Sequence, residues 1–254
     1  LVSGWTLSAE RRLALQRTRA GRATFDHLAA QLDTALPPVQ RVGTNPAVMF
    51  QLLPLALQHP DIAGSTMRYT ICSGLTGTMT RALWDGVLDC YVGRIHWDEV
   101  PPQIAGALCH VPLMTTDLVV ACARTHPLAR KSRLRISDLA GWDWALPPGN
   151  SKNRIALEAG LRNNGLPHAN ATFEIAADPN ALMILVREME LLTILPRLAL
   201  DRAVAADLCA LGLVDLRMPA MQIGFFTLAE HAQMPALQNL RQALAEAAQA
   251  VTSA

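Results

Sequence analysis

The feature that most constrains this fold is the alternation of short apolar segments with helical segments that begins after Pro38. Parallel strands need a long crossover connection, which is usually a helix. The order strand, helix, strand, helix, strand therefore predicts a parallel sheet covered by helices. In the first series we expect strands over 39–44, 65–71 and 88–92, with helices over 46–58 and 76–84.

A second series of the same kind begins at Asp117. Two such series in one chain predict two Rossmann-like α/β subdomains with a ligand cleft between them. We assign residues 39–116 and 224–254 to subdomain I and residues 117–223 to subdomain II. The further predicted elements are strands over 117–122, 142–146, 172–176, 191–195 and 223–229, and helices over 151–164, 180–188 and 234–248.

Residues 8–36 predict a long helix, because this stretch has no proline and is rich in strong helix formers. Its apolar residues recur near helical periodicity, so the helix has one apolar face and needs a partner. The helix is expected to end at Pro37-Pro38. Five arginines in its first half fit either a solvated surface or proximity to DNA phosphates: Arg11, Arg12, Arg17, Arg19 and Arg22.

The composition describes a chain that buries a core and carries almost no net charge. Of 254 residues, 51% are hydrophobic, and the formal net charge is +1, so no overall field favours nucleic acid or a membrane. The five cysteines are scattered without a C-x-x-C pair or metal-ligand spacing, which predicts buried reduced thiols, no metal and no cofactor. No apolar run is long enough to span a bilayer, so we expect a cytoplasmic protein without a membrane partner.

Several short motifs occur in an order that resembles the LysR-type transcriptional regulators. The most specific combination is Leu118-Val119-Val120, then the segment 125–129 (T-H-P-L-A), then Ile136-Ser137-Asp138-Leu139. The resemblance runs from the long helix through nearly the whole chain. The other matching segments are 41–44 (R-V-G-T), 52–54 (L-L-P), 74–76 (G-L-T), 84–89 (W-D-G-V-L-D) and 194–196 (I-L-P).

The resemblance implies a type 2 periplasmic-binding-protein-like effector-binding domain, preceded by a linker helix that dimerises. It also implies a homodimer or homotetramer that binds promoter DNA through an N-terminal winged helix-turn-helix domain. This sequence lacks that domain, apart from a possible remnant in residues 1–7, so we expect no DNA binding by the chain as given. Residues 89–94 resemble a variant of the subgroup that senses sugars and aromatic acids, which suggests an aromatic, sugar-derived or other carboxylate effector.

One stretch departs from the family pattern. Relatives favour glycines before the strand that ends in Leu195-Pro196, whereas residues 187–192 (R-E-M-E-L-L) contain none. Side chains in this stretch are expected either to narrow the wall of the cleft or to change the turn.

Candidate ligand-binding residues follow the ends of the predicted strands, where open α/β sheets bind ligands near helix N-termini. Each has a competing structural role: Thr44 and Asn45 as helix caps, the 73–76 loop as a cap, and Arg94 as a salt-bridge partner. In subdomain II, His126 is expected to be a cap or to face solvent. The candidates are Thr44, Asn45, Ser73, Gly74, Thr76, Gly93 and Arg94 in subdomain I, and Thr125, Asn150 and Ser151 in subdomain II.

Three other functions compete with effector sensing. A periplasmic-type solute receptor shares the two-lobed architecture but needs a signal peptide. An enzyme is disfavoured because the sequence has no nucleophile elbow, phosphate-binding glycine loop or H-E-x-x-H motif. A ligand-independent regulator, with a cleft filled by its own side chains, is a lesser alternative to which the glycine-poor stretch lends some weight.

Overall fold

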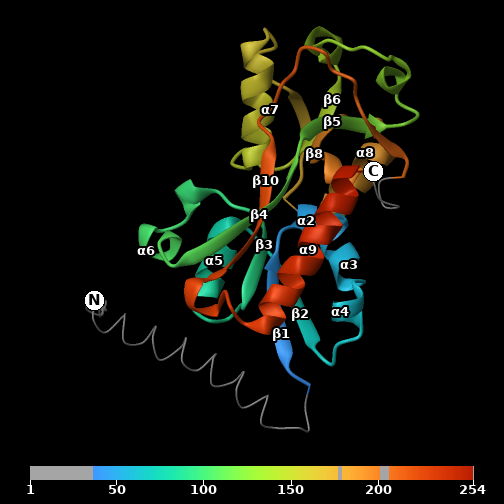
Figure 1. Ribbon diagram of the computed structural model, residues 1–254. Helices are drawn as coiled ribbons and strands as arrows, with labels where there is room; N and C mark the ends of the chain where they lie inside the picture. The colour runs from blue at the N-terminus through green and yellow to red at the C-terminus, as the bar shows by residue number, and fades with distance from the viewer. Residues whose placement is uncertain (1–36, 177–178, 201–205, 254) are drawn as a thin grey trace, which may run out of the picture. The chain divides into compact units, whose positions relative to one another are not determined.

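The computed structural model describes residues 37–176, 179–200 and 206–253, in which the chain forms two compact units (Figure 1). Unit 1 contains the described residues up to Met114 and those from Gln222 onward, and unit 2 is Thr115–Met221. The predicted linker helix over 8–36 lies outside the described residues. Within the described residues, no helix is long and apolar enough to cross a membrane.

Unit 1 is built on a five-stranded sheet with the order β2-β1-β3-β10-β4. Strands β2, β1 and β3 are parallel, as predicted, and β10 pairs antiparallel with β3. The strands are β1 (Val39–Thr44), β2 (Arg68–Ser73), β3 (Cys90–Arg94), β4 (Leu108–Thr116) and β10 (Met221–Leu228).

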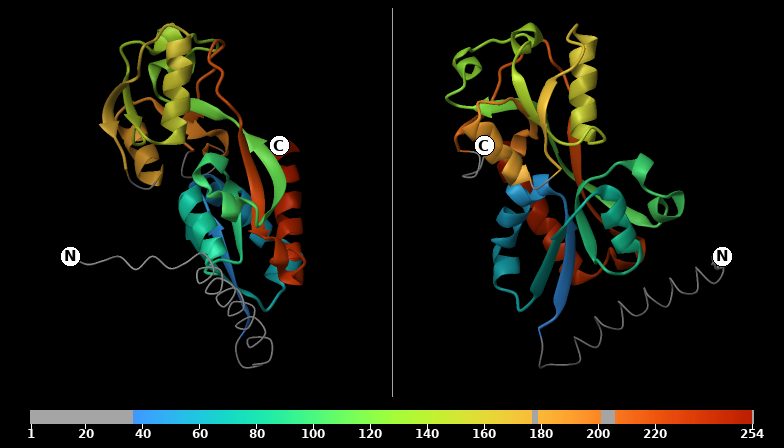
Figure 2. Two further views of the ribbon diagram at one scale, coloured as in Figure 1. Left: turned by 90° about the vertical axis from the view of Figure 1, so that its left-hand side faces the viewer. Right: turned by 180° about the vertical axis from the view of Figure 1, so that it is seen from behind.

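Helices cover both faces of this sheet. The connection from β1 to β2 runs one way along the sheet, and the connection from β2 to β3 runs the opposite way. Because both connections are right-handed, their helices lie on opposite faces of the sheet. Helix α9 packs on α3 and α4, and Figure 2 shows α9 and α5 on opposite sides of the sheet. The helices are α2 (Pro46–Phe50), α3 (Leu52–Leu57), α4 (Pro60–Ala63), α5 (Thr76–Trp84), α6 (Pro102–Ala105) and α9 (Pro235–Ser253).

The predicted helix over 46–58 is wrong in one respect, because the chain breaks it into α2 and α3. Gln51 lies at the break, with φ −142° and ψ −55°, outside the helical region. Pro54 lies three residues beyond and has no N–H to complete a continuous helical ladder. Strand β4 was not predicted, since His110 and Pro112 interrupt its apolar pattern.

Unit 2 has three-stranded and two-stranded ladders, with orders β8-β5-β9 and β6-β7. Strand β5 pairs antiparallel with β8, so the second series is not a simple parallel repeat of the first. A parallel bridge between Trp144 and Leu192 joins β6 to the start of β8. The elements are β5 (Leu118–Ala123), β6 (Asp143–Leu146), α7 (Lys152–Asn163), β7 (Asn170–Glu174), α8 (Pro179–Glu188), β8 (Thr193–Pro196) and β9 (Leu208–Ala210).

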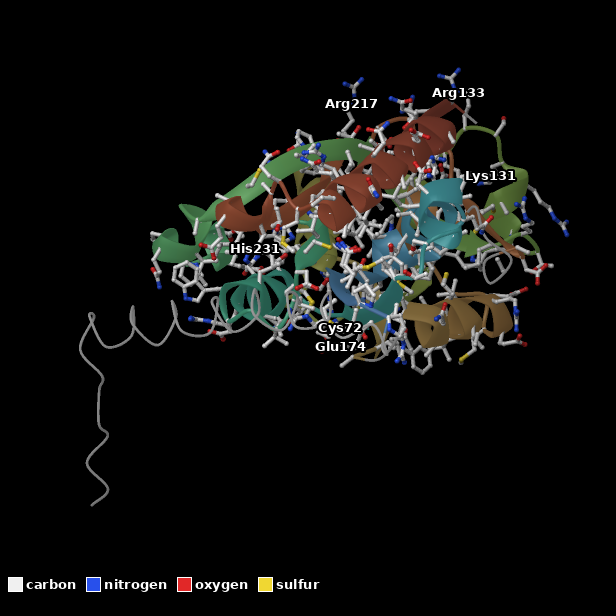
Figure 3. The ribbon with its side chains drawn as sticks, turned by 60° about the horizontal axis from the view of Figure 1, so that its bottom comes forward. Cys72, Lys131, Arg133, Glu174, Arg217 and His231 are labelled. Atoms are coloured by element: carbon white, nitrogen blue, oxygen red, sulfur yellow. The ribbon has the colours of Figure 1, made fainter. Side chains whose placement is uncertain are left out.

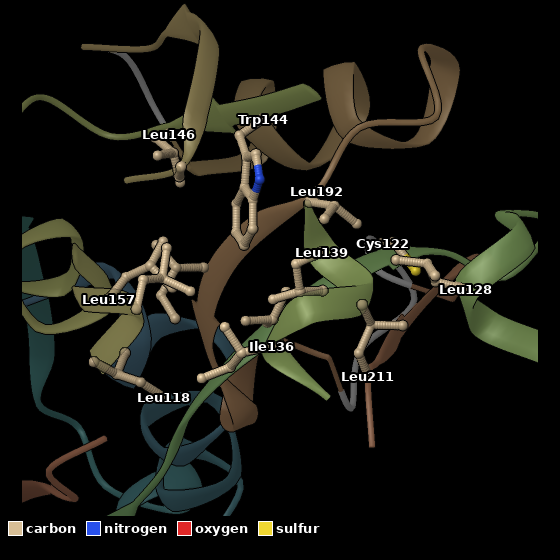
Figure 4. Close-up of a cluster of buried hydrophobic side chains, with 14 of the residues drawn as sticks. Leu118, Cys122, Leu128, Ile136, Leu139, Trp144, Leu146, Leu157, Leu192 and Leu211 are labelled. Carbon is tan, nitrogen blue, oxygen red and sulfur yellow. The ribbon is translucent and has the colours of Figure 1, made fainter. Parts of the chain in front are cut away.

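The core of unit 2 gathers apolar side chains from strands, helix α7 and the short helical turns (Figure 4). Trp144 is fully buried at its centre, and Leu157 and Leu161 of α7 pack there one turn apart. Helical spacing of four residues puts the two leucines on one face, and this face of α7 packs on the core.

Helix α8 ends in a left-handed turn at Glu190, whose φ is +53°. The N–H of Leu191 donates to the carbonyl oxygen of Val186 at 3.4 Å, which is the 6→1 hydrogen bond of a Schellman motif. The residue at this position is usually glycine, because a Cβ is strained there. The glycine-poor stretch therefore keeps the turn and places a glutamate in it.

Candidate functional site

The seven candidates of unit 1 lie together at the carboxyl edge of its parallel strands. Thr44 is in register with Ser73 on β2 and with Val92 on β3, so the three strands reach this edge at the same level. Gly93 and Arg94 extend β3 by two residues, and Thr76 begins helix α5 beside it. The sequence-based grouping of these residues is thus reproduced within unit 1.

Thr44 and Asn45 are tied into the framework of this edge. The fully buried Thr44 hydroxyl donates to the carbonyl oxygen of Val92 at 3.0 Å. The Asn45 side-chain oxygen accepts from the N–H of Val48 at 3.2 Å, as an N-cap does. The structural roles considered for both residues are therefore present, and they leave Thr44 without an exposed hydroxyl.

The end of β3 is held by a tyrosine that sequence reasoning missed. The buried Tyr91 hydroxyl donates to the carbonyl oxygen of Arg94 at 2.7 Å, and Thr76 donates to the same oxygen at 3.1 Å. Burial raises the pKa of Tyr91 to about 12, so it remains a neutral donor. A Cβ at Gly93 would lie 2.6 Å from the Tyr91 hydroxyl oxygen, so glycine is required where the ring passes under the strand.

The accessible part of the edge includes Ser73, Leu75 and Arg94. Ser73 is exposed, and Leu75 is 79% exposed, which is unusual for leucine. Leu75 precedes α5 without a side-chain cap bond, so the first-turn amides present partial positive charge. Burial lowers the pKa of the half-buried Arg94, and nearby Glu99 opposes that shift. Together they offer apolar contact beside donors suited to a carboxylate.

In unit 2, Asn150 and Ser151 form the turn that leads from β6 into α7. Asn150 is exposed, and the N–H of Ser151 donates to the carbonyl oxygen of Pro148 at 2.8 Å. Arg154, in the first turn of α7, is a residue that the sequence analysis missed. It pairs with Glu174 at 2.6 Å and also donates to the carbonyl oxygen of Pro147 at 3.2 Å.

Thr125 lies at the other end of the unit 2 sheet. It follows the carboxyl end of β5, which is antiparallel to β8, whereas β6 runs parallel to β8. Thr125 therefore lies at the opposite end of the unit 2 strands from Asn150 and Ser151, and the three residues do not share one strand edge. The antiparallel pairing explains this separation, since a shared edge was inferred from parallel order.

His126 was expected to be a cap or to face solvent, and the structure shows that it is a cap whose side chain is buried. It is fully buried, and its Nδ1 accepts from the N–H of Leu128 at 3.1 Å. Its ring packs against Trp142 with centroids 4.4 Å apart. Burial lowers the pKa of His126, so the neutral ring is favoured for the role that Nδ1 performs.

The described residues offer no cluster of three or more histidine, cysteine, aspartate or glutamate side chains that could hold a metal ion. What unit 1 presents is a strand-end edge with one exposed hydroxyl, an arginine and a helix N-terminus. Such an edge can bind a small molecule. The fold and this edge together indicate a two-unit α/β binding domain, but they do not identify its ligand.

Comparison with known proteins identifies the family. The LysR substrate binding domain model matches residues 38–249, so the chain belongs to this family. LysR substrate-binding domains are parts of transcriptional regulators, and they have the type 2 periplasmic-binding-protein-like fold. Enzymatic activity is therefore not the function of this domain.

Solved structures agree on the fold. The CcmR regulatory domain of Synechocystis PCC6803 in complex with 2-PG is 16% identical, with a TM-score of 0.67, over 84% of this chain and 98% of that one. The effector binding domain of QuiR in complex with shikimate is 16% identical, with a TM-score of 0.65, over the same shares. CbnR, a LysR family transcriptional regulator, is 16% identical, with a TM-score of 0.66, over 98% of this chain and 84% of that one.

Proposed function

We propose that this chain is the effector-sensing and oligomerising part of a LysR-type regulator, and that its effector is a small carboxylate. The observation that carries the proposal is the carboxyl edge of β2, β1 and β3, where Ser73, Arg94 and the start of α5 lie together. The solved relatives with 2-PG and shikimate carry anionic ligands, which supports a carboxylate here.

We place the effector in the predicted cleft between subdomain I (39–116 and 224–254) and subdomain II (117–223). Asn150 and Ser151 are the proposed contacts from subdomain II, and Ser73 and Arg94 are those from subdomain I. Thr44, Asn45, Gly74, Thr76 and Gly93 shape the edge, and Thr125 is the weakest candidate because of its place in the sheet. Effector binding then shifts the population between two oligomer geometries through its differential affinity for them.

Promoter DNA is the second proposed partner, bound through a winged helix-turn-helix domain of the kind that the family resemblance implies. CbnR has a structure of its full-length form with target DNA, which supports this assignment. The proposed oligomer is a homodimer or homotetramer, and the proposed location is the cytoplasm.

A thermal-shift screen against aromatic acids, sugar acids and other small carboxylates tests the proposal. A ligand at a hundredfold excess over its Kd stabilises the folded form by about 2.7 kcal/mol, or a rise of about 5–10 °C in Tm. Ser73→Ala should reduce the rise without lowering the Tm of the free protein, because Ser73 is exposed. The matched control is Ser132→Ala, at an exposed serine of unit 2, which should leave the rise unchanged.

Thr44→Ala is a poorer test than Ser73→Ala. Its hydroxyl is buried and bonded to Val92, so the substitution lowers stability whether or not a ligand contacts Thr44. A panel that gives no shift with well-folded protein would favour the ligand-independent regulator.

A further inference from the structure

Two cysteines of unit 2 face each other across neighbouring strands. Cys122 on β5 is directly opposite Cys209 on β9 in the antiparallel register. Directly opposite residues project their side chains to the same face of a sheet, so the two thiols are neighbours. Both are free thiols, and neither has a part in the proposed effector site.

The ladder around the pair sets the distance that a bond between them must span. The N–H of Leu211 donates to Val120, and the N–H of Arg124 donates to Asp207, at 2.8 and 2.7 Å. Alternation along the ladder makes Cys122 and Cys209 a hydrogen-bonded pair, for which Cα atoms lie about 5.5 Å apart. That separation is inside the range of disulfides, about 4.4–6.8 Å.

The general dimensions of a β-sheet indicate that such a bond is easy to reduce again. Opposite Cβ atoms lie about 4.5–5.5 Å apart in a sheet, whereas a relaxed disulfide prefers about 3.5–4.5 Å. The two strands must therefore draw together locally to form the bond. A disulfide under such strain is more oxidising than a relaxed structural one, and thiols of the cell reduce it readily.

The surroundings decide which thiol reacts first. Cys122 is fully buried in the core of unit 2, beside Leu128 (Figure 4). Burial, with Cys209 as a second cause, raises the pKa of Cys122 to about 12, which keeps it a protonated thiol. Cys209 is half-buried, so an oxidant reaches it from solvent first.

We propose that Cys122 and Cys209 form a reversible disulfide, a redox-modification site that responds to a two-electron oxidant such as hydrogen peroxide. Cys209 first attacks the peroxide, which gives Cys209 sulfenic acid and one water molecule. The Cys122 sulfur then attacks the sulfenic sulfur, and the hydroxyl leaves with the thiol proton as a second water. Two thiols are thereby oxidised by two electrons, and one peroxide is reduced to two water molecules.

The test uses the whole chain with Cys72→Ser and Cys109→Ser. Cys72 is an exposed thiol on edge strand β2 (Figure 3), and Cys109 has no Lys or Arg between it and Cys122 for trypsin to cut. Native protein is treated with hydrogen peroxide, denatured under a thiol-blocking reagent, digested and examined by mass spectrometry. The three remaining thiols should fall to one, with a Cys122–Cys209 peptide that dithiothreitol separates.

Single variants separate the two steps of the proposal. Cys122→Ala should leave a Cys209 sulfenic acid that dimedone traps, and Cys209→Ala should leave Cys122 as a thiol. Cys90→Ala, a buried cysteine of unit 1, is the matched control and should still form the cross-link. Circular dichroism before oxidation verifies that each variant is folded. Cys122 and Cys209 that both stay reduced in folded protein, or that cross-link only in denaturant, would overturn the proposal.

Discussion

Replacing Glu190 with glycine should stabilise this protein, although most substitutions destabilise. Glu190 occupies the left-handed position of the α8 cap with φ +53° and an exposed side chain. That conformation costs a residue with a Cβ roughly 1–2 kcal/mol. Glycine removes this strain but loses about 0.5–1 kcal/mol through the greater freedom of its unfolded chain. The expected net gain in the free energy of unfolding is about 0.5–1 kcal/mol.

Two further variants isolate the backbone effect. Glu190→Ala keeps the Cβ and removes the charge, so its stability should stay close to that of the parent. Glu188→Gly, in the last turn of α8, should cost about 1 kcal/mol, because glycine is a poor helix former. Urea unfolding, followed by circular dichroism and tryptophan fluorescence, gives the three values. A Glu190→Gly protein as unstable as Glu188→Gly would refute the assignment of strain to Glu190.

The remaining predictions concern charge and packing. Asp89 is 5% exposed and accepts two hydrogen bonds from the Arg41 guanidinium. Asp89→Ala should therefore lower the free energy of unfolding by about 3 kcal/mol, because it leaves the arginine without its buried partner. A loss under about 1 kcal/mol in urea unfolding would contradict a buried ion pair. Burial lowers the pKa of His126 and His110 from 6.5, so the unfolded chain binds more protons. The urea concentration at the midpoint of unfolding should therefore stay constant above pH 6.5 and decrease as the pH falls toward the folded-state pKa values. An increase on acidification would contradict the lowered pKa values. Leu240→Ala should cost about 3 kcal/mol by leaving a cavity under α9, with Gln242→Ala on the same helix as a near-neutral control.

Local chemistry explains why the framework of unit 1 was predictable. The strand over 39–44 and the helix over 76–84 have the predicted bounds, since turn residues and apolar runs define them. The other predicted strands were displaced by one to three residues, because hydrogen bonding to neighbours, rather than the apolar run itself, decides where a ladder ends. Strands β4 and β9 were not predicted. Gln51 could not be identified as a helix break, since glutamine is ordinarily a good helix former.

The site was predictable only as far as strand order determines it. Parallel strands bring their carboxyl ends together, so the seven residues of unit 1 were grouped from sequence alone. The distinction between the buried Thr44 and the exposed Ser73 depends on register, and the role of Tyr91 on where its hydroxyl reaches. Thr125 and Asn150 were grouped by the same rule, which antiparallel pairing in unit 2 does not satisfy. The subdomain division and the ten site residues remain proposals.

The affinity of a ligand found in the screen for the parent chain and for Ser73→Ala tests the central claim most directly. Isothermal titration gives the Kd of each, and Ser132→Ala serves as the control. Effector sensing at this edge predicts saturable binding of a small carboxylate, weakened about tenfold or more by Ser73→Ala, which corresponds to one lost hydrogen bond to a charged group. Equal affinity in all three proteins would place the ligand elsewhere and contradict the proposed site.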